Sequence, residues 1–327
     1  MAQQSAHSHE PVPVLYVGGI GRSGSTVLGR VLATLPGVHS VGEVVHLWAR
    51  GLVGGDRCGC GERFAECPLW TRVGELAFGG WSNVDAGHLI ALQGAVDRNR
   101  YLVWLMAGRG PGSFQRDLRE YVDILDRLYR ALAAASGAQV LVDTSKNAPY
   151  AWLLRLVPSV QLQILHLVRD SHGVAYSWAK QGVSRPEVAG ESAYMDTLPV
   201  ARLALRWTGA NALFDLMGRT HTPLLRLRYE DFVDDPANAV TRVAAFIGRT
   251  ATTPALKTGQ ALELPKEHEV SGNPLRFTTA AVKLRRDDAW QSHMTAADRR
   301  LVTLLTAPGL WRYGYPPLGD RVAAAPG

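Results

Sequence analysis

The chain has 327 residues, of which 46% are hydrophobic and 20% are charged, a composition typical of a globular protein with a large core. Lysine and arginine exceed aspartate and glutamate by 35 to 29, and this net charge of +6 favours an anionic ligand. The basic residues form no dense block that would grip a nucleic-acid backbone, and no apolar run approaches the roughly 20 residues that span a bilayer. We therefore expect neither a nucleic-acid partner nor a membrane span.

The two ends of the chain are predicted to be tails. The first ten residues, M-A-Q-Q-S-A-H-S-H-E, have neither the basic region nor the apolar region of a secretory signal. We therefore expect a flexible tail over residues 1–10 and a cytoplasmic location. A second tail is expected over 316–327, which leaves residues 11–315 as one domain.

Strand-like and helix-like segments alternate along the chain. Short apolar runs, rich in β-branched residues, predict buried strands, and apolar residues at helical spacing predict helices between them. This alternation is typical of an α/β protein, a three-layer α/β/α fold with a central, mostly parallel sheet. The expected strands are 12–18, 139–142, 162–168 and 223–227, and the helices expected after the first and second of them are 25–35 and 150–156.

Three further segments are predicted to be largely helical. Residues 64–132 and 179–206 are rich in tryptophan, tyrosine and helical patterns, so we expect helices and lids that cover the sheet. Residues 231–248 start with a turn, D-D-P-A-N, and continue as an amphipathic helix. In a parallel sheet ligands bind beyond the carboxyl ends of the strands, and polar clusters follow each expected strand.

The first such cluster is the glycine-rich stretch V-G-G-I-G-R-S-G-S-T. Successive glycines let backbone N–H groups converge on an anion, and the following helix adds the positive end of its dipole. Ser25 and Thr26 add hydroxyl groups, and the guanidinium of Arg22 can take an oxyanion bidentately. Gly24-Ser25-Thr26 replaces the Gly-Lys-Ser/Thr of nucleotide-hydrolysing loops, so their lysine is missing. A plain glycine turn between strand and helix is the alternative.

This stretch resembles the 5′-phosphosulfate loop of sulfotransferases that use 3′-phosphoadenosine 5′-phosphosulfate (PAPS), many of which have P-R-S-G-T-T or P-K-S-G-T-T there. The resemblance extends from Tyr16 to about Trp290 and is strongest to the bacterial branch. It implies the P-loop-type sulfotransferase fold and PAPS as donor. The donor-binding residues implied in this loop are Gly21, Arg22, Ser23, Gly24, Ser25, Thr26 and Val27.

A second motif, L-V-R-D-S-H-G-V-A-Y-S, resembles the 3′-phosphate motif of the same family. In that motif an arginine ends a strand and a serine lies eight positions later, and Arg169 and Ser177 have this spacing. An arginine can take a phosphate bidentately, and a hydroxyl two turns into the next helix can reach the same group. The alternative is an ion pair between Arg169 and a loop carboxylate, with Ser177 as an ordinary helix residue.

A third motif, S-G-N-P-L-R-F, resembles the G-N-P-x-R-F loop that closes over the nucleotide in bacterial members. The resemblance implies that Gly272 and Asn273 bind the donor and that Arg276 is a further cation for the 3′-phosphate. Three later residues are expected either to extend the wall of this nucleotide site or to belong to a solvated basic helix face. They are Arg285, Arg286 and Trp290.

Sulfuryl transfer is an in-line displacement that needs a base for the nucleophile and cations for the leaving group. Glu43 lies where a G-E pair carries the base in the family branch that includes tyrosylprotein sulfotransferases. Burial near the reacting sulfur would raise the pKa of this carboxyl toward working pH. The alternatives are a surface salt bridge for Glu43, or His46 or His172 as the base, since many cytosolic members use histidine.

The stretch D-T-S-K resembles the D-S-S-K element of bacterial members. It implies that Lys146 reaches the bridging oxygen or the acceptor, while Arg22 neutralises the sulfonate and the 5′-phosphate. Tyr229 is expected to line the sulfonate pocket or else to be a buried aromatic. No metal is required. A P-loop kinase that uses ATP with Mg²⁺ near Asp143 is an alternative, as is a non-catalytic nucleotide-binding module.

The acceptor is expected to be a small molecule, lipid or carbohydrate with a hydroxyl group. Several aromatic residues are candidates for its pocket and equally for the core. They are Trp81, Tyr101, Trp104, Trp178, Tyr194 and Trp207. No helix shows a sustained heptad, so the sequence gives no expectation of oligomeric state.

Three cysteines, Cys58, Cys60 and Cys67, lie within ten residues. Similar C-x-C-G and C-P segments occur in related bacterial sequences. The three thiols could bind zinc with His46 or His39 as a fourth ligand, but the spacing is not a pair of C-x-x-C motifs. A local disulfide or free buried thiols are favoured, because the cytosol is reducing.

Overall fold

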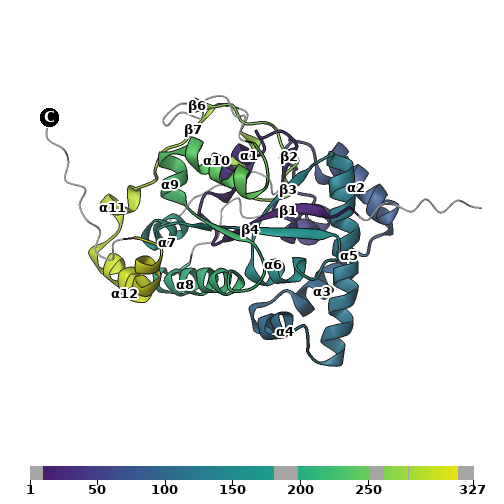
Figure 1. Ribbon diagram of the computed structural model, residues 1–327, viewed down its shortest axis with the longest axis horizontal. Helices are drawn as coiled ribbons and strands as arrows, with labels where there is room; N and C mark the ends of the chain where they lie inside the picture. Colours follow the sequence, from purple (N-terminus) through teal and green to yellow (C-terminus); the bar gives the residue numbers. More distant parts are fainter. Residues whose placement is uncertain (1–9, 180–197, 251–260, 279, 316–327) are drawn as a thin grey trace, which may run out of the picture.

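The computed structural model describes residues 10–179, 198–250, 261–278 and 280–315. Within them, the centre of the fold is a five-stranded sheet in which every neighbouring pair of strands is parallel, in the order β2-β3-β1-β4-β5 (Figure 1). A separate short pair, β6 and β7, is antiparallel. The strands are β1 (Val12–Gly19), β2 (Val38–Gly42), β3 (Val140–Lys146), β4 (Val160–Val168), β5 (Leu224–Arg228), β6 (Ala261–Leu262) and β7 (Val282–Lys283).

Helices connect successive strands of the main sheet, as parallel pairing requires. The longest of those described is α5, whose glycine C-cap, Gly137, has a φ of 65°. The α-helices of the described residues are α1 (Ser25–Leu32), α2 (Pro68–Phe78), α3 (Ala86–Val96), α4 (Leu102–Ala107), α5 (Gly112–Ser136), α6 (Ala148–Leu154), α7 (Ser171–Ala179), α8 (Val200–Met217), α9 (Tyr229–Asp234), α10 (Pro236–Phe246), α11 (Ala289–His293) and α12 (Ala296–Arg312).

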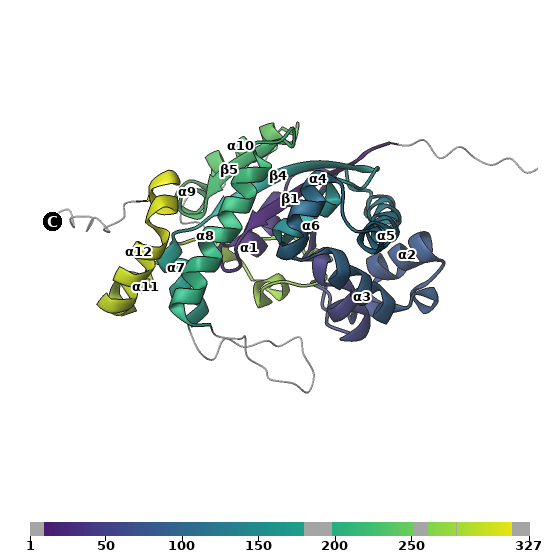
Figure 2. The same cartoon turned by 90° about the horizontal axis from the view of Figure 1, so that it is seen from below.

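The sheet is buried on both faces because apolar side chains alternate along its strands. Val14 and Tyr16 of β1 belong to one core with residues of α2 to α6 and α8, whereas Leu15 and Val17 belong to a second core with α1, α9 and α10. Figure 1 shows α9 and α10 on one side of the sheet and α6 and α8 on the other, and Figure 2 views the molecule from the α6 and α8 side. The three-layer α/β/α prediction is therefore confirmed.

The expected strands are present, but two elements beside the site were not predicted. β3 continues beyond the expected end at 142 to Lys146, because its polar residues still pair with β1. No strand was predicted at β2, because its sequence V-H-S-V-G carries only a short apolar signal. α9, which begins at Tyr229, was not predicted. The turn and amphipathic helix expected over 231–248 correspond to Asp235, which caps α10, and to α10 itself.

Some predictions lie partly or wholly outside the described residues. These are residues 1–9 of the expected N-terminal tail, residues 180–197 of the expected segment 179–206, Tyr194 within it, and the C-terminal tail 316–327. Among the helices that the structure describes, none combines the length and the apolarity that crossing a membrane requires.

Candidate active site

Each strand of the main sheet ends beside a residue that the sequence motifs selected. Because parallel strands finish at the same edge of a sheet, their final residues are brought together there. All five side chains line one cavity of about 1390 Å³, which is larger than a typical small-ligand pocket. In sheet order from β2 to β5, these residues are Glu43, Lys146, Arg22, Arg169 and Tyr229.

Most of the other predicted donor-binding residues line the same cavity. They are Gly21, Gly24, Ser25, Thr26, Val27, Ser177, Gly272 and Asn273. Ser23 and Arg276 are not among the lining residues, and their exposed fractions are only 1% and 2%. The fold therefore brings together residues of motifs that lie more than 200 positions apart in the sequence. Two of the predicted donor-binding residues, Ser23 and Arg276, are instead buried behind the cavity wall.

The glycine-rich loop leaves the start of α1 open to an anion. Gly24 is the residue before α1, with a left-handed φ of 86°, and no side chain caps the helix. The first N–H groups of a helix have no partner within it, so an uncapped, cavity-lining start can bind negative charge. A Cβ at Gly24 would lie 2.8 Å from the ring of Tyr229. The loop conformation thus depends on glycine at this position.

We expect Gly24→Ala to destabilise the protein by about 1–3 kcal/mol and to weaken nucleotide binding, because alanine is strained at this φ and contacts Tyr229. Gly112→Ala at the start of α5 is the matched control, since its Cβ would meet nothing within 4 Å. Urea unfolding and calorimetric titration measure the two effects. Equal behaviour of the two variants would show that the loop tolerates a side chain.

Two non-glycine residues among those described have positive φ, and both are predicted catalytic residues. Arg22 has a φ of 72° and Lys146 a φ of 66°. A left-handed conformation costs a residue with a side chain of order 1–3 kcal/mol and persists where the surroundings impose it, often at functional sites. This backbone strain supports a functional role for both positions.

Glu43 and Lys146 are in direct contact across the ends of the neighbouring strands β2 and β3. The ammonium group of Lys146 donates to Oε1 of Glu43 at 2.5 Å and to the carbonyl oxygen of Thr144 at 2.8 Å. Nε2 of His46 lies 3.5 Å from Oε2 of the same glutamate. Glu43 and Lys146 both line the cavity and are largely buried. The surface salt bridge considered from sequence is therefore a buried, cavity-lining pair.

The pKa of Glu43 is lowered, not raised as the sequence analysis expected. Burial acts to raise the pKa of this carboxyl, but the charges of Lys146 and His46 and the hydrogen bond from Lys146 outweigh it. The expectation was wrong because it considered burial without the cation on the adjacent strand. In the ligand-free protein Glu43 is therefore an ionised carboxylate that can accept a proton.

Arg169 is held at the end of β4 by contacts with three neighbours. Its guanidinium donates to the carbonyl oxygen of Arg22 at 2.8 Å and to Oδ2 of Asp287 at 3.1 Å, and it stacks on Tyr229 at 4.5 Å from the ring centre. The ion pair with a loop carboxylate that the sequence left as an alternative is thus present. Ser177 on α7 lines the same cavity, so both members of the predicted 3′-phosphate pair border it.

The loop around Gly272 closes the cavity beside α1. The backbone N–H of Asn273 donates to Oγ1 of Thr26 at 3.3 Å. Arg276 donates to the carbonyl oxygens of Gly272 at 2.8 Å and Arg57 at 3.2 Å. These contacts direct the guanidinium of Arg276 into the protein. In this position Arg276 supports the loop, whereas the sequence predicted a contact with the 3′-phosphate.

The three later residues that were expected either to extend the wall of the nucleotide site or to lie on a basic helix face occupy different environments. Arg285 lines the cavity, whereas Arg286 pairs with Asp234 at an exposed site. Trp290 stacks on His172, with ring centroids 4.8 Å apart. His172 is not among the cavity-lining residues, so its ring has a packing role in this structure.

Asp143, on which the kinase alternative depends, is fully buried. It accepts hydrogen bonds from the hydroxyl of Tyr129 at 2.5 Å and the backbone N–H of Ser145 at 2.8 Å. Burial, opposed by these hydrogen bonds, raises the pKa of Asp143 to about 6. Because this carboxylate is not a cavity-lining residue, it is not placed to hold the metal of a bound nucleotide.

Of the aromatic residues considered for the acceptor pocket, Trp178 lines the cavity and donates to the carbonyl oxygen of Gly21 at 3.1 Å. Trp207 is a core residue that donates to the carbonyl oxygen of Arg169 at 2.8 Å. Three others pack against the larger core, namely Trp81, Tyr101 and Trp104.

Several polar cavity residues were not predicted, because they lie outside the recognised motifs. Arg50, which follows β2 in a π-helical turn, donates to Oγ of Ser271 at 2.9 Å. The others lie on α8 or beside the ends of helices. They are Asn99, Asn147, Arg202 and Arg206.

The three cysteines lie apart from this cavity and are all free. Neither histidine considered as a fourth zinc ligand faces them, since His39 lies 3.5 Å from Glu267 and His46 lies beside Glu43. His268 is the imidazole that does face them. It was missed because it is more than 200 positions away in sequence.

The fold and site together define an α/β protein in which a strand–loop–helix unit at the edge of a parallel sheet borders a large cavity, an arrangement that can accept an anionic ligand. A family model for the sulfotransferase domain matches residues 15–303. The chain therefore belongs to the sulfotransferase domain family, and its general activity is sulfuryl transfer.

A solved sulfotransferase domain has a similar fold. The sulfotransferase domain of the Synechococcus PCC 7002 olefin synthase has 21% identity and a TM-score of 0.55, with 97% of this chain and 99% of that one covered. A sulfotransferase from Alicyclobacillus acidocaldarius has 14% identity and a TM-score of 0.41, with 92% and 93% covered. One from Mycobacterium avium has 13% identity and a TM-score of 0.44, with 94% and 78% covered. No curated protein matches the sequence.

Proposed function

We propose that the protein transfers the sulfuryl group of PAPS to a hydroxyl group of a small-molecule, lipid or carbohydrate acceptor. The observation that carries the proposal is the contact between Glu43 and Lys146, a carboxylate and an ammonium group 2.5 Å apart in the cavity that the glycine-rich loop borders. A base and a cation side by side match the needs of an in-line displacement, whose nucleophile loses a proton while its leaving group gains charge.

Each step has a residue in this cavity. Glu43 takes the proton of the acceptor hydroxyl as its oxygen attacks sulfur. The bond between sulfur and the bridging oxygen breaks, and adenosine 3′,5′-bisphosphate (PAP) leaves with the electron pair. Lys146 and Arg22 neutralise the charge on the bridging oxygen and the sulfonate. Tyr229 lines the wall beside them.

The donor is held at its two phosphates. The uncapped start of α1 and the backbone of residues 21–27 bind the 5′-phosphosulfate, while Arg169 and Ser177 bind the 3′-phosphate. Gly272 and Asn273 form the wall over the nucleotide. Arg276, which bonds to the carbonyl oxygen of Gly272, supports that wall from behind.

Donor binding also prepares the base. In the ligand-free protein Lys146 holds the pKa of Glu43 low. When its ammonium group turns to the anionic donor, that stabilisation of the carboxylate weakens, while burial, which raises the pKa, remains. Glu43 thus becomes a stronger base only when the donor is present.

The acceptor side of the cavity is formed by α8. This helix contributes Leu203, Leu205 and Leu213 together with two cations, Arg202 and Arg206. Apolar side chains between positive charges favour an acceptor with an apolar body and a polar or anionic group. An amphiphilic alcohol is the kind of acceptor that this lining supports.

Titration calorimetry with PAP, and separately with ATP and Mg²⁺, tests the choice of donor. We expect PAP to bind with a Kd in the micromolar range or below and ATP to bind at least about 100-fold more weakly, because Arg169 and Ser177 provide a 3′-phosphate site that ATP cannot use. Tighter binding of ATP would replace the proposal with the kinase alternative. PAP binding without turnover of PAPS against a panel of alcohols would favour a non-catalytic module.

A further inference from the structure

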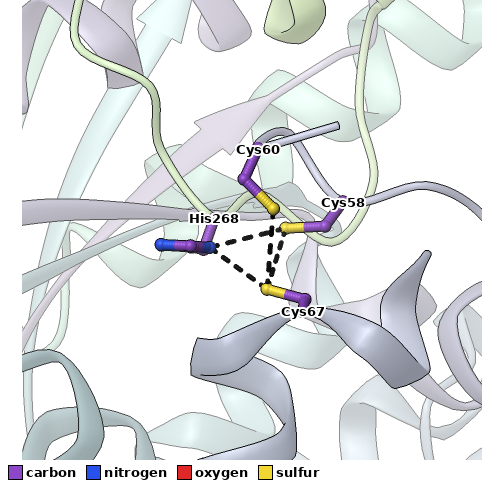
Figure 3. Close-up of side chains that lie close together, drawn as sticks. All are labelled: Cys58, Cys60, Cys67 and His268. Atoms are coloured by element: carbon purple, nitrogen blue, oxygen red, sulfur yellow. Dashed lines mark hydrogen bonds between the residues drawn. The ribbon is translucent and has the colours of Figure 1, made fainter. Parts of the chain in front are cut away.

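Away from the cavity, four side chains of the kinds that bind metals converge on one point (Figure 3). Sγ of Cys67 lies 3.5 Å from Sγ of Cys58, 3.7 Å from Sγ of Cys60 and 3.1 Å from Nδ1 of His268. Sγ of Cys58 lies 3.9 Å from the same nitrogen. All four atoms are within 4.8 Å of one another, so one small ion between them could contact them all.

The separations match a tetrahedral zinc site. With Zn–S bonds of about 2.3 Å and Zn–N bonds of about 2.0–2.1 Å, two sulfurs lie about 3.8 Å apart and a sulfur and a nitrogen about 3.6 Å apart. Four of the six separations, 3.1 to 3.9 Å, lie within about 0.5 Å of these values, and the other two, from Sγ of Cys60 to Cys58 and to His268, are at most 4.8 Å. Three thiolates and one imidazole are also a common ligand set of structural zinc.

The chain is folded to bring the cysteines of the turn close to the histidine segment. The N–H of Cys58 donates to the carbonyl oxygen of Glu62, and that of Gly59 donates to the carbonyl oxygen of Glu269, at 2.8 and 2.9 Å. A Cβ at Gly59 would lie 2.5 Å from the carbonyl oxygen of Glu267. Only glycine at position 59 permits this approach, which places the cysteines against His268.

Cys67 has a second feature that suits a metal ligand. It is the residue before the first turn of α2, where the positive end of the helix dipole stabilises a thiolate. The histidine is fixed as well, because the indole N–H of Trp70, on the same helix, donates to the carbonyl oxygen of His268 at 3.0 Å. The four groups are thus held in place by the backbone around them.

We propose a closed, structural zinc site whose four ligands are Cys58, Cys60, Cys67 and His268. A disulfide would use only two of the three thiols. It would give no role to the third thiol or to the imidazole of His268, although both face the same point. A catalytic zinc keeps a position open for water or substrate, whereas here protein groups fill all four. The ion therefore stabilises the fold and takes no part in sulfuryl transfer.

The zinc site fixes a wall of the active-site cavity. Four residues after His268 the chain reaches Gly272, which lines that cavity, and the N–H of Val270 between them pairs with Val41 of β2 at 3.1 Å. Arg276 joins the two regions directly, because it bonds to the carbonyl oxygens of Gly272 and of Arg57, the residue before Cys58. Loss of zinc should therefore loosen the Gly272 loop as well as the cysteine turn.

Metal analysis of the full-length protein, purified without added metal or chelator, tests the site. We expect about one zinc per chain in the unaltered protein. Cys67→Ser should lose most of it. His39→Ala, which removes a nearby histidine that does not face the cysteines, should retain it. His268→Cys should also retain zinc, since it completes a four-cysteine site, whereas His268→Ala should bind it more weakly.

Cobalt titration covers the case in which Cys67→Ser does not fold. Unaltered protein stripped with chelator should take up one equivalent of Co²⁺ with the thiolate charge-transfer and ligand-field bands of a tetrahedral sulfur-rich site. Stripping should lower the thermal midpoint by roughly 5–10 °C, and added zinc should restore it. Zinc-free protein that takes up no cobalt, a disulfide among the three cysteines, or equal zinc in Cys67→Ser would overturn the proposal.

Discussion

Glu43→Gln is expected to lower kcat by about 10²- to 10⁴-fold while PAP binding changes by less than about threefold. Glutamine keeps the shape of the side chain and an oxygen that can accept from Lys146, but it cannot take the proton of the acceptor hydroxyl. Turnover is followed as PAP release from PAPS with the best alcohol of a panel, and binding is measured by calorimetry.

His46→Gln is the matched variant, because His46 is the other cavity-lining candidate for the base. It should retain turnover to within about tenfold. If it loses turnover while Glu43→Gln keeps it, the imidazole is the base and the assignment of Glu43 is wrong.

The pH profile gives a second readout of the same assignment. Because Lys146 and His46 outweigh burial and lower the pKa of Glu43, the acid limb of kcat/KM, which reports the free enzyme, should lie below the ordinary value of 4.5. The acid limb of kcat should lie higher if Lys146 turns to the bound donor. Coincident limbs would contradict that movement.

Arg169→Ala is expected to weaken PAP binding roughly 10- to 150-fold, since a hydrogen bond to a charged group is worth about 1.5–3 kcal/mol. The matched ligand is AMP, which lacks the 3′-phosphate, and its affinity should change little. Calorimetric titration of both ligands into both proteins separates loss of the phosphate contact from a general disturbance of the cavity. An equal loss for AMP and PAP would remove Arg169 from the 3′-phosphate site.

Asp287→Asn is the complementary variant. Asp287 pairs with the guanidinium of Arg169 in the ligand-free protein at 3.1 Å, so it competes with a phosphate for the same donors. Removal of its charge should leave PAP binding as tight or tighter. Weaker binding would indicate that the carboxylate positions Arg169 for the ligand.

Motifs at strand ends could be predicted because their geometry is local. Val12 to Leu32 form a strand, loop and helix through their own periodicity and glycines, and the parallel sheet then fixes the edge at which the strands end. The contact of Glu43 with Lys146 could not be foreseen in the same way. It depends on β2 lying next to β3, and β2 was too short and too weakly apolar to be recognised.

The contacts that single side chains make with distant parts of the chain could not be predicted from the sequence. Arg276 belongs to a motif, yet the direction of its side chain is set by the carbonyl oxygens of Gly272 and Arg57. His268 belongs to no motif and meets Cys67 across 201 positions. Such contacts arise from the packing of whole elements, which residue spacing does not encode.

The left-handed backbone of Arg22 and Lys146 sets a limit on how stable this protein can become without loss of activity. Glycine adopts that conformation at no steric cost, so a selection for thermal stability alone would favour its appearance at both positions. Each such gain would remove a cation from the cavity. At these two positions thermal stability and turnover rate are therefore opposed. Substitutions meant to raise the thermal stability of the protein have to be made at other positions.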